Sequence, residues 1–112
     1  MNIDEILNEV KQDQMGVTIT LQNTGGYAAK FNVSYYDAQG IKHSDCYNGI
    51  TAGVKKNIDI PAGSTRLCVN GKAATFIKSW SDIFTDTMYT PASVTYHVTG
   101  TSLITKWEKI GA

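Results

Sequence analysis

The sequence lacks an excess of charge of either sign. Its 112 residues hold ten basic and ten acidic side chains, so the formal net charge is zero. A nucleic-acid-binding domain or a polybasic membrane anchor gains much of its affinity from an excess of positive charge. The composition therefore argues against both classes.

Long apolar runs are also missing. No run approaches the ~20 residues that a membrane-spanning helix needs. The N-terminus carries acidic residues and has no apolar segment of the kind found in signal peptides. We therefore expect a protein that stays in the cytoplasm or is released by a non-classical route.

Only two cysteines occur, Cys46 and Cys68, so at most one disulfide can form. Their spacing matches no metal-binding or redox motif. In the absence of a signal peptide, we expect two reduced and largely buried thiols rather than a disulfide.

Catalytic motifs are absent as well. The sequence has no nucleophile elbow, no zinc-protease motif and no phosphate-binding glycine loop. The two histidines, His43 and His97, fall in different predicted strands. His43 and Cys46 have an odd spacing, so on a strand they would point to opposite faces. The sequence therefore predicts a protein without enzymatic activity, metal or cofactor.

What the sequence does contain is alternation of apolar and polar residues, which begins after Gly16. Short alternating segments separated by Gly, Pro, Asn and Asp are typical of an all-β sandwich or barrel. The predicted strands cover residues 17–21, 27–36, 41–47, 54–60, 65–70, 93–99 and 103–110, and residues 83–89 are ambiguous. We predict an antiparallel β-sandwich of about seven or eight strands over residues 15–112.

The first fourteen residues have a different period. Apolar residues recur there at the spacing of one helix face, with Asn2 as N-cap and Glu5 completing a capping box. The apolar stripe consists of Ile3, Ile6, Leu7 and Val10. We predict a short helix over residues 1–14. It either packs on its own domain, which we favour, or mediates homo-oligomerisation.

The order of the strands predicts where the connections lie. If successive strands alternate in direction, every second connection lies at the same end of the sandwich. Four connections then gather at one end: residues 23–26, 48–53, 71–81 and 100–104. Loops that cluster at one end of a rigid sandwich are where binding usually occurs.

The connection over residues 71–81 breaks the alternation. Phe76 and Trp80 are four residues apart, which suits one turn of helix. This pair either packs onto the end of the sandwich or forms an exposed apolar tip that contacts a membrane or a ligand.

The order of these segments resembles the C-terminal β-sandwich, domain 4, of the cholesterol-dependent (thiol-activated) cytolysins. Residues 16–37 resemble the start of that domain, and residues 54–70 its next pair of strands. Residues 71–81 fall at the position of the family's Trp-rich undecapeptide. Residues 94–103 resemble the penultimate strand and the loop that holds a cholesterol-recognising Thr-Leu pair.

In that family the domain recognises the membrane, and separate domains build the pore. The resemblance implies a stand-alone recognition module without pore-forming domains. The sequence departs from the family pattern, because only Trp80 remains of three tryptophans and Ser102-Leu103 replaces the Thr-Leu pair. Each large side chain buried in lipid contributes about 2 kcal/mol, so fewer aromatic residues imply weaker insertion.

The resemblance and the loop positions together give a set of candidate contacts for a membrane lipid. They are Gly25, Gly26, Ile50, Lys72, Phe76, Ile77, Lys78, Trp80, Ser102, Leu103 and Ile104. The same loops suit a glycan- or protein-binding module in which Trp80 stacks on a sugar ring and nearby Asn and Lys side chains supply polar contacts. Whether the lipid is a sterol stays open.

Overall fold

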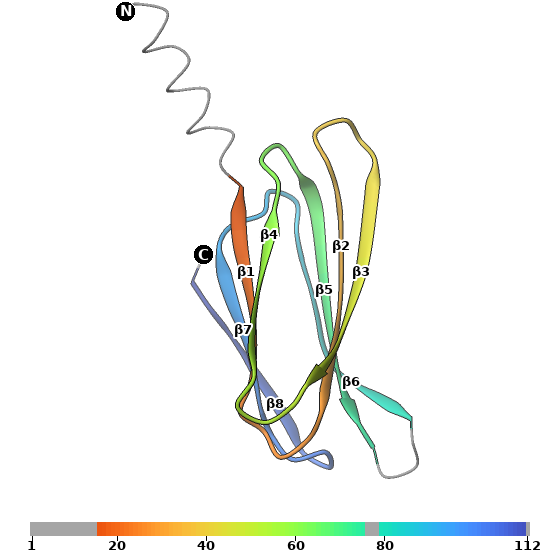
Figure 1. Ribbon diagram of the computed structural model, residues 1–112, viewed down its shortest axis with the longest axis vertical. Helices are drawn as coiled ribbons and strands as arrows, with labels where there is room; N and C mark the ends of the chain where they lie inside the picture. Colours follow the sequence, from red (N-terminus) through yellow and green to blue (C-terminus); the bar gives the residue numbers. More distant parts are fainter. Residues whose placement is uncertain (1–15, 76–78, 112) are drawn as a thin grey trace, which may run out of the picture.

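The computed structural model describes residues 16–75 and 79–111, and these form eight β-strands with their connections (Figure 1). The strands are β1 (Val17–Asn23), β2 (Ala29–Tyr36), β3 (Lys42–Ile50), β4 (Lys55–Ile60), β5 (Thr65–Ala74), β6 (Trp80–Met88), β7 (Val94–Gly100) and β8 (Thr105–Ile110). The ambiguous segment 83–89 belongs mainly to β6. The predicted helix over residues 1–14, and the oligomeric role assigned to it, lie outside the described residues. The described ranges hold no helix long and apolar enough to cross a membrane.

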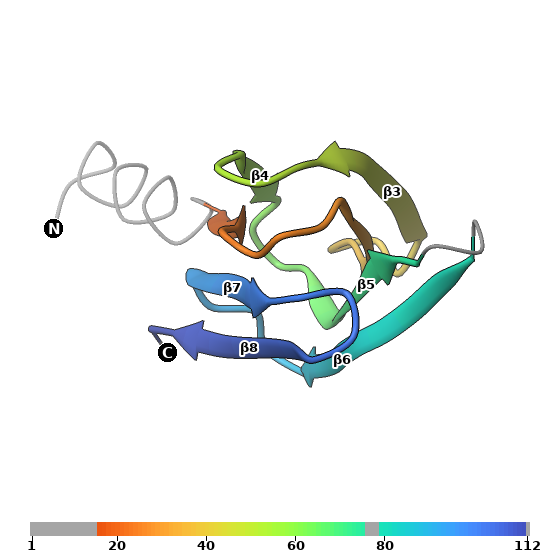
Figure 2. The same cartoon turned by 90° about the horizontal axis from the view of Figure 1, so that it is seen from below.

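The strands form two four-stranded sheets packed face to face, in the orders β4-β1-β7-β8 and β3-β2-β5-β6 (Figure 2). The predicted β-sandwich is therefore confirmed. All neighbouring strands are antiparallel except β1 and β7, which are parallel. Successive strands alternate in direction, so two odd-numbered strands run the same way and must pair in parallel when they become neighbours.

The core lies between the sheets because every second residue of each central strand points inward. The ring of Phe84 stacks on the rings of Tyr96 and Trp107, at centroid distances of 5.2 and 4.6 Å. A Cβ at Gly71 would lie 2.4 Å from a carbon of the Phe84 ring. Glycine is therefore required at position 71, since the aromatic ring occupies the space of a side chain.

A polar contact joins the two sheets at the β6 and β8 edges. The hydroxyl of the fully buried Tyr96 donates a hydrogen bond of 2.7 Å to Asp86 Oδ2, and Lys109 Nζ lies 3.0 Å from the same oxygen. Burial alone would raise the pKa of Asp86, but the hydrogen bonds from Tyr96 and Lys109 outweigh it and lower that pKa. The carboxylate thus stays ionised between the sheets.

This contact predicts a loss of stability in acid. Because the folded-state pKa of Asp86 lies below its unfolded value of about 4, the ionised form stabilises the fold above about pH 4. That contribution disappears as the pH falls through the folded-state pKa. We expect Asp86→Asn to be less stable than the wild type at neutral pH and to lose less stability on acidification, as measured by urea unfolding across the pH range.

The exposed Asp59 provides the matched control, and Asp59→Asn should keep the wild-type pH dependence. Equal acid sensitivity in Asp86→Asn and the wild type would contradict the role assigned to Asp86.

Candidate functional site: the loop pole

Four connections lie together at one end of the sandwich, which we call the loop pole (bottom of Figure 1). They are residues 24–28, 51–54 and 101–104, which follow β1, β3 and β7, and the connection after β5, of which residues 75 and 79 are described. The structure therefore brings together the four connections that the alternation of strand direction predicts. The last three are shorter than expected because their strands extend further toward the pole, whereas the first extends to residue 28 because β2 begins at Ala29.

The buried side chain of Asn23 organises two of these loops. Its Nδ2 donates hydrogen bonds to the carbonyl oxygens of Tyr27 and Ile50, at 2.6 and 2.8 Å. Its Oδ1 accepts a hydrogen bond of 2.8 Å from the backbone N–H of Gly25. Its backbone N–H donates to the carbonyl of residue 54 at 3.1 Å, and its backbone carbonyl accepts from the N–H of residue 53 at 2.8 Å. One side chain without solvent exposure therefore fixes the 24–28 loop against the end of β3.

The 24–28 loop in turn fixes the end of β7. The Tyr27 hydroxyl donates to the Thr99 carbonyl at 2.8 Å, and the Gly26 N–H donates to the Gly100 carbonyl at 3.0 Å. Burial raises the pKa of the Tyr27 hydroxyl, so it remains a neutral donor. A Cβ at Gly25 would lie 2.5 Å from the Tyr27 ring. Glycine at position 25 therefore lets that ring pack against the loop.

The 101–104 turn holds two large apolar side chains in solvent. Leu103 is 83% exposed and Ile104 is 68% exposed. The Thr101 N–H donates to the Ile104 carbonyl at 3.0 Å, and the Ile104 N–H donates to Thr101 Oγ1 at 3.1 Å. Gly100 precedes the turn with φ of +88°, a conformation that favours glycine. The turn thus has a defined shape despite its exposure.

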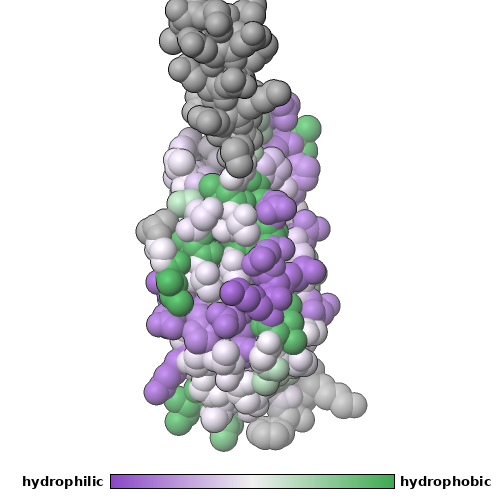
Figure 3. All heavy atoms as spheres, turned by 60° about the vertical axis from the view of Figure 1, so that its left-hand side comes forward, coloured by the Kyte–Doolittle hydropathy of each residue, from purple (hydrophilic) through white to green (hydrophobic). Residues whose placement is uncertain are grey.

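Figure 3 shows hydrophobic atoms at this lower end of the molecule, below a band of hydrophilic atoms. Exposed apolar side chains of this size mark contact surfaces when they lie next to each other. Ser102, the third candidate in this turn, is partly buried.

The described residues of the segment 71–81 belong mainly to strands. Residues 71–74 belong to β5, and Trp80 opens β6 opposite Ala74. The Thr75 N–H donates to the Ser79 carbonyl at 2.9 Å. Trp80 therefore belongs to a strand, and the rest of the helical turn expected from Phe76 to Trp80 falls mainly outside the described residues. The other three candidates of this segment lie outside the described residues: Phe76, Ile77 and Lys78.

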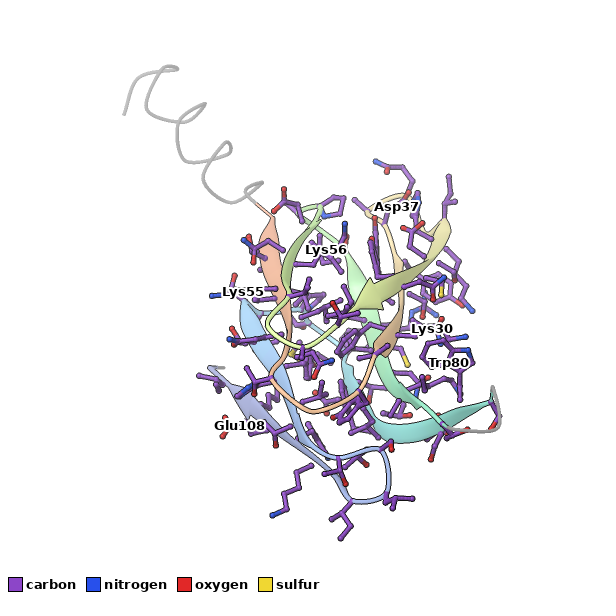
Figure 4. The ribbon with its side chains drawn as sticks, turned by 60° about the horizontal axis from the view of Figure 1, so that its bottom comes forward. Lys30, Asp37, Lys55, Lys56, Trp80 and Glu108 are labelled. Carbon is purple, nitrogen blue, oxygen red and sulfur yellow. The ribbon has the colours of Figure 1, made fainter. Side chains whose placement is uncertain are left out.

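Trp80 lies beside the pole, on the outer face of its sheet, with 40% of its surface exposed. Lys30 Nζ sits 4.5 Å from the centre of its ring (Figure 4). Lys72, another candidate, forms an ion pair of 2.8 Å with Asp82 on the same face. That hydrogen bond lowers the pKa of Asp82. Trp80 and Lys72 therefore stand above the loops, not at their tips.

Two of the remaining candidates are not available to a ligand. The side chain of Ile50 is 3% exposed and belongs to the core, so it is not placed to make the ligand contact that the sequence suggested. Gly25 is buried beneath Tyr27, whereas Gly26 is exposed. The two glycines contribute by positioning the loops through their backbone hydrogen bonds.

The cysteines also differ from expectation. Both are free thiols, but Cys46 is exposed, because β3 is an edge strand whose outer face meets solvent. Cys46 lies on β3, opposite Asn32 of β2. Cys68 lies on β5, the other neighbour of β2, opposite Ser34. A disulfide would have to cross the intervening strand, which is further than its geometry allows.

A shallow hollow of about 310 Å³ lies on the same outer face. It is lined by Asn32, Val33, Ser34, Ser44, Asp45, Cys46, Cys68 and Asn70. Asn70 Nδ2 donates to the Phe84 carbonyl at 2.9 Å, so part of this polar lining is already engaged. Within the described ranges, no group of three His, Cys, Asp or Glu side chains is placed to hold a metal ion.

Comparison with known proteins identifies the family. Residues 18–106 match the model of the thiol-activated cytolysin beta sandwich domain. The chain belongs to this family. The resemblance inferred from the sequence is therefore confirmed. No curated protein is similar enough to the chain to count as a match.

Solved structures share the fold at low identity. The membrane-binding domain of pneumolysin is 21% identical, with a TM-score of 0.70, over 87% of this chain and 97% of that domain. Suilysin from Streptococcus suis is 19% identical with a TM-score of 0.72, and listeriolysin O is 20% identical with a TM-score of 0.64. Each of these two matches covers 88% of this chain, which spans 24% of suilysin and 23% of listeriolysin O.

Asn23 gives the sharpest test of how the pole is built. Asn23→Ala removes three side-chain hydrogen bonds and leaves buried backbone groups unpaired, and each such group costs about 1–3 kcal/mol. We expect the free energy of unfolding to fall by about 3 kcal/mol or more, as measured by urea denaturation.

Asn57→Ala is the matched control. Asn57 makes one exposed side-chain contact, of 2.9 Å with Thr20, so its loss should change stability by no more than about 0.5 kcal/mol. Similar losses in the two variants would show that Asn23 does not organise the pole.

Proposed function

We propose that this domain is a non-enzymatic membrane-recognition module that contacts the bilayer with its loop pole. The observation that supports this most strongly is the exposure of Leu103 and Ile104 side by side on a turn of defined shape. The fold shared with the membrane-binding domain of pneumolysin adds support.

The turn is suited to shallow insertion. A bilayer offers no hydrogen bonds, so backbone groups that enter it must be paired within the protein. The Thr101–Ile104 contacts pair two backbone N–H groups and one carbonyl inside the turn. Burial of a large apolar side chain contributes about 1.5–3 kcal/mol, so two of them favour a reversible association.

The flank of the pole suits the interfacial region. Trp80 has an apolar ring and a polar N–H, a combination enriched where lipid meets water. It stands on the strand above the loops, in contact with the Lys30 ammonium. We infer that Leu103 and Ile104 enter first and that Trp80 lies at headgroup level. The Ser102 hydroxyl, next to Leu103, would then hydrogen-bond a lipid headgroup or a sterol hydroxyl.

A second candidate function is glycan binding on the outer face of the β3-β2-β5-β6 sheet. The hollow lined by Asn32, Ser44 and Asn70 favours it, because amide and hydroxyl groups bind sugar hydroxyls. Vesicles free of glycans separate the two functions, since a glycan site alone would give no vesicle binding.

Replacing the apolar tip should weaken vesicle binding. We expect Leu103→Ser with Ile104→Ser to weaken binding to phosphatidylcholine vesicles, prepared with and without cholesterol, by at least about tenfold. Co-flotation with the vesicles measures it.

The matched control is Ile41→Ser, which removes an apolar side chain of 60% exposure from the turn at the opposite end. It should bind like the wild type. If the tip variant and the control bound equally well, the loop pole would not be the membrane contact.

A further inference from the structure

The loop pole carries positive charge that the overall composition hides. The last three strand residues at this end, taken over all eight strands with the described residues of the connections, include five lysines and one acidic residue. The lysines are Lys30, Lys55, Lys56, Lys72 and Lys106, and the acidic residue is Asp82. Although the formal net charge of the whole chain is zero, most lysines of the described residues therefore lie at one end of the sandwich.

The opposite end carries one more acidic than basic residue. Its equivalent strand residues and turns carry Asp37, Asp59, Asp86 and Glu108 against Lys42, Arg66 and Lys109. Figure 4 shows Asp37 far from the pole, with Lys55 and Lys56 on one side of the molecule and Lys30 beside Trp80 on the other. The cations therefore surround the pole rather than forming a single patch.

Most of these lysines keep their charge available. Of these five lysines, only Lys72 forms an ion pair with a described residue, Asp82. Lys30 lies over the Trp80 ring and Lys56 over the Tyr47 ring, at 4.5 and 5.4 Å, contacts that leave a cation uncompensated. Lys55 and Lys106 are exposed. The nearest acidic side chain further along β8, Glu108, accepts a hydrogen bond from His97 at 2.9 Å.

We propose that the loop pole selects bilayers containing anionic phospholipid, with the lysines bound to headgroup phosphates and carboxylates around the inserted Leu103 and Ile104. This proposal rests on the proposed function and adds the class of lipid. The spacing supports it. Lys106 is two residues after the 101–104 turn, and Lys55 directly follows the 51–54 loop. A strand rises about 3.3 Å per residue, which places these ammonium groups roughly one headgroup layer behind the apolar tip.

The electrostatic contribution has a measurable size. Each lysine near an anionic surface strengthens binding by about fivefold, and this gain falls when salt shortens the screening length. Binding to anionic vesicles should therefore be at least about tenfold tighter than to neutral vesicles at low ionic strength. The difference should shrink as salt is added.

The experiment uses phosphatidylcholine vesicles with and without phosphatidylserine, each at low and high salt. The wild type is compared with Lys55→Gln plus Lys106→Gln, which removes two exposed charges that have no ion-pair partner among the described residues. The control is Lys42→Gln plus Arg66→Gln, which removes the same charge from the opposite end. We expect the first variant to lose at least about tenfold in binding to phosphatidylserine vesicles only, and the control to bind like the wild type.

The outcomes separate this inference from the proposed function. Equal binding to neutral and anionic vesicles, or equal losses in the two variants, would overturn the lipid selectivity and leave membrane recognition intact. Failure to bind any vesicle would overturn both.

Discussion

The buried side chain of Asn23 is the constraint on which the loop pole depends. Its amide holds the 24–28 loop and the end of β3, and its backbone holds the 51–54 loop. The 24–28 loop then holds Thr99 and Gly100 through Tyr27 and Gly26. The Ala28 carbonyl accepts from the Ala74 N–H at 2.9 Å, which links the β5–β6 hairpin to the same loop. The connections after β1, β3 and β7, and the end of β5 at Ala74, are thereby fixed relative to the fully buried side chain of Asn23.

This arrangement explains how an exposed apolar turn keeps its shape. Leu103 and Ile104 make little contact with the core, so packing does not position them. Their position comes instead from the hydrogen-bonded turn and from Gly100, where a Cβ would lie 2.3 Å from the Ile104 carbonyl oxygen. Backbone hydrogen bonds replace side-chain packing here, and the apolar side chains remain free for an external partner. The charge separation between the two ends adds an orientation to the same surface, because an anionic plane attracts the lysine-rich end first.

The sequence was sufficient to predict the sandwich and the gathering of the loops, because both follow from alternation and turn residues. It also led to the exposed pair Leu103 and Ile104. It misplaced Ile50, because alternation alone does not show where β3 ends and an apolar residue at a loop margin suits either side. It also missed the role of Asn23, since an asparagine at a strand end is an ordinary turn signal and its burial depends on contacts 27 residues away. The uneven distribution of charge could not be predicted for a similar reason. Net charge is a sum over the chain, whereas the electrostatic potential at each end depends on which residues lie at the ends of the strands.

The central claim is that the turn at Leu103 enters the bilayer while the opposite end stays in water. An environment-sensitive fluorophore attached to a single cysteine tests this directly, with Cys46 and Cys68 replaced by serine. On addition of anionic vesicles, the label at Leu103→Cys should become brighter and shift to the blue, whereas the label at Ile41→Cys should not change. An unchanged emission at position 103 on vesicles that bind the protein, or an equal change at both positions, would contradict the account.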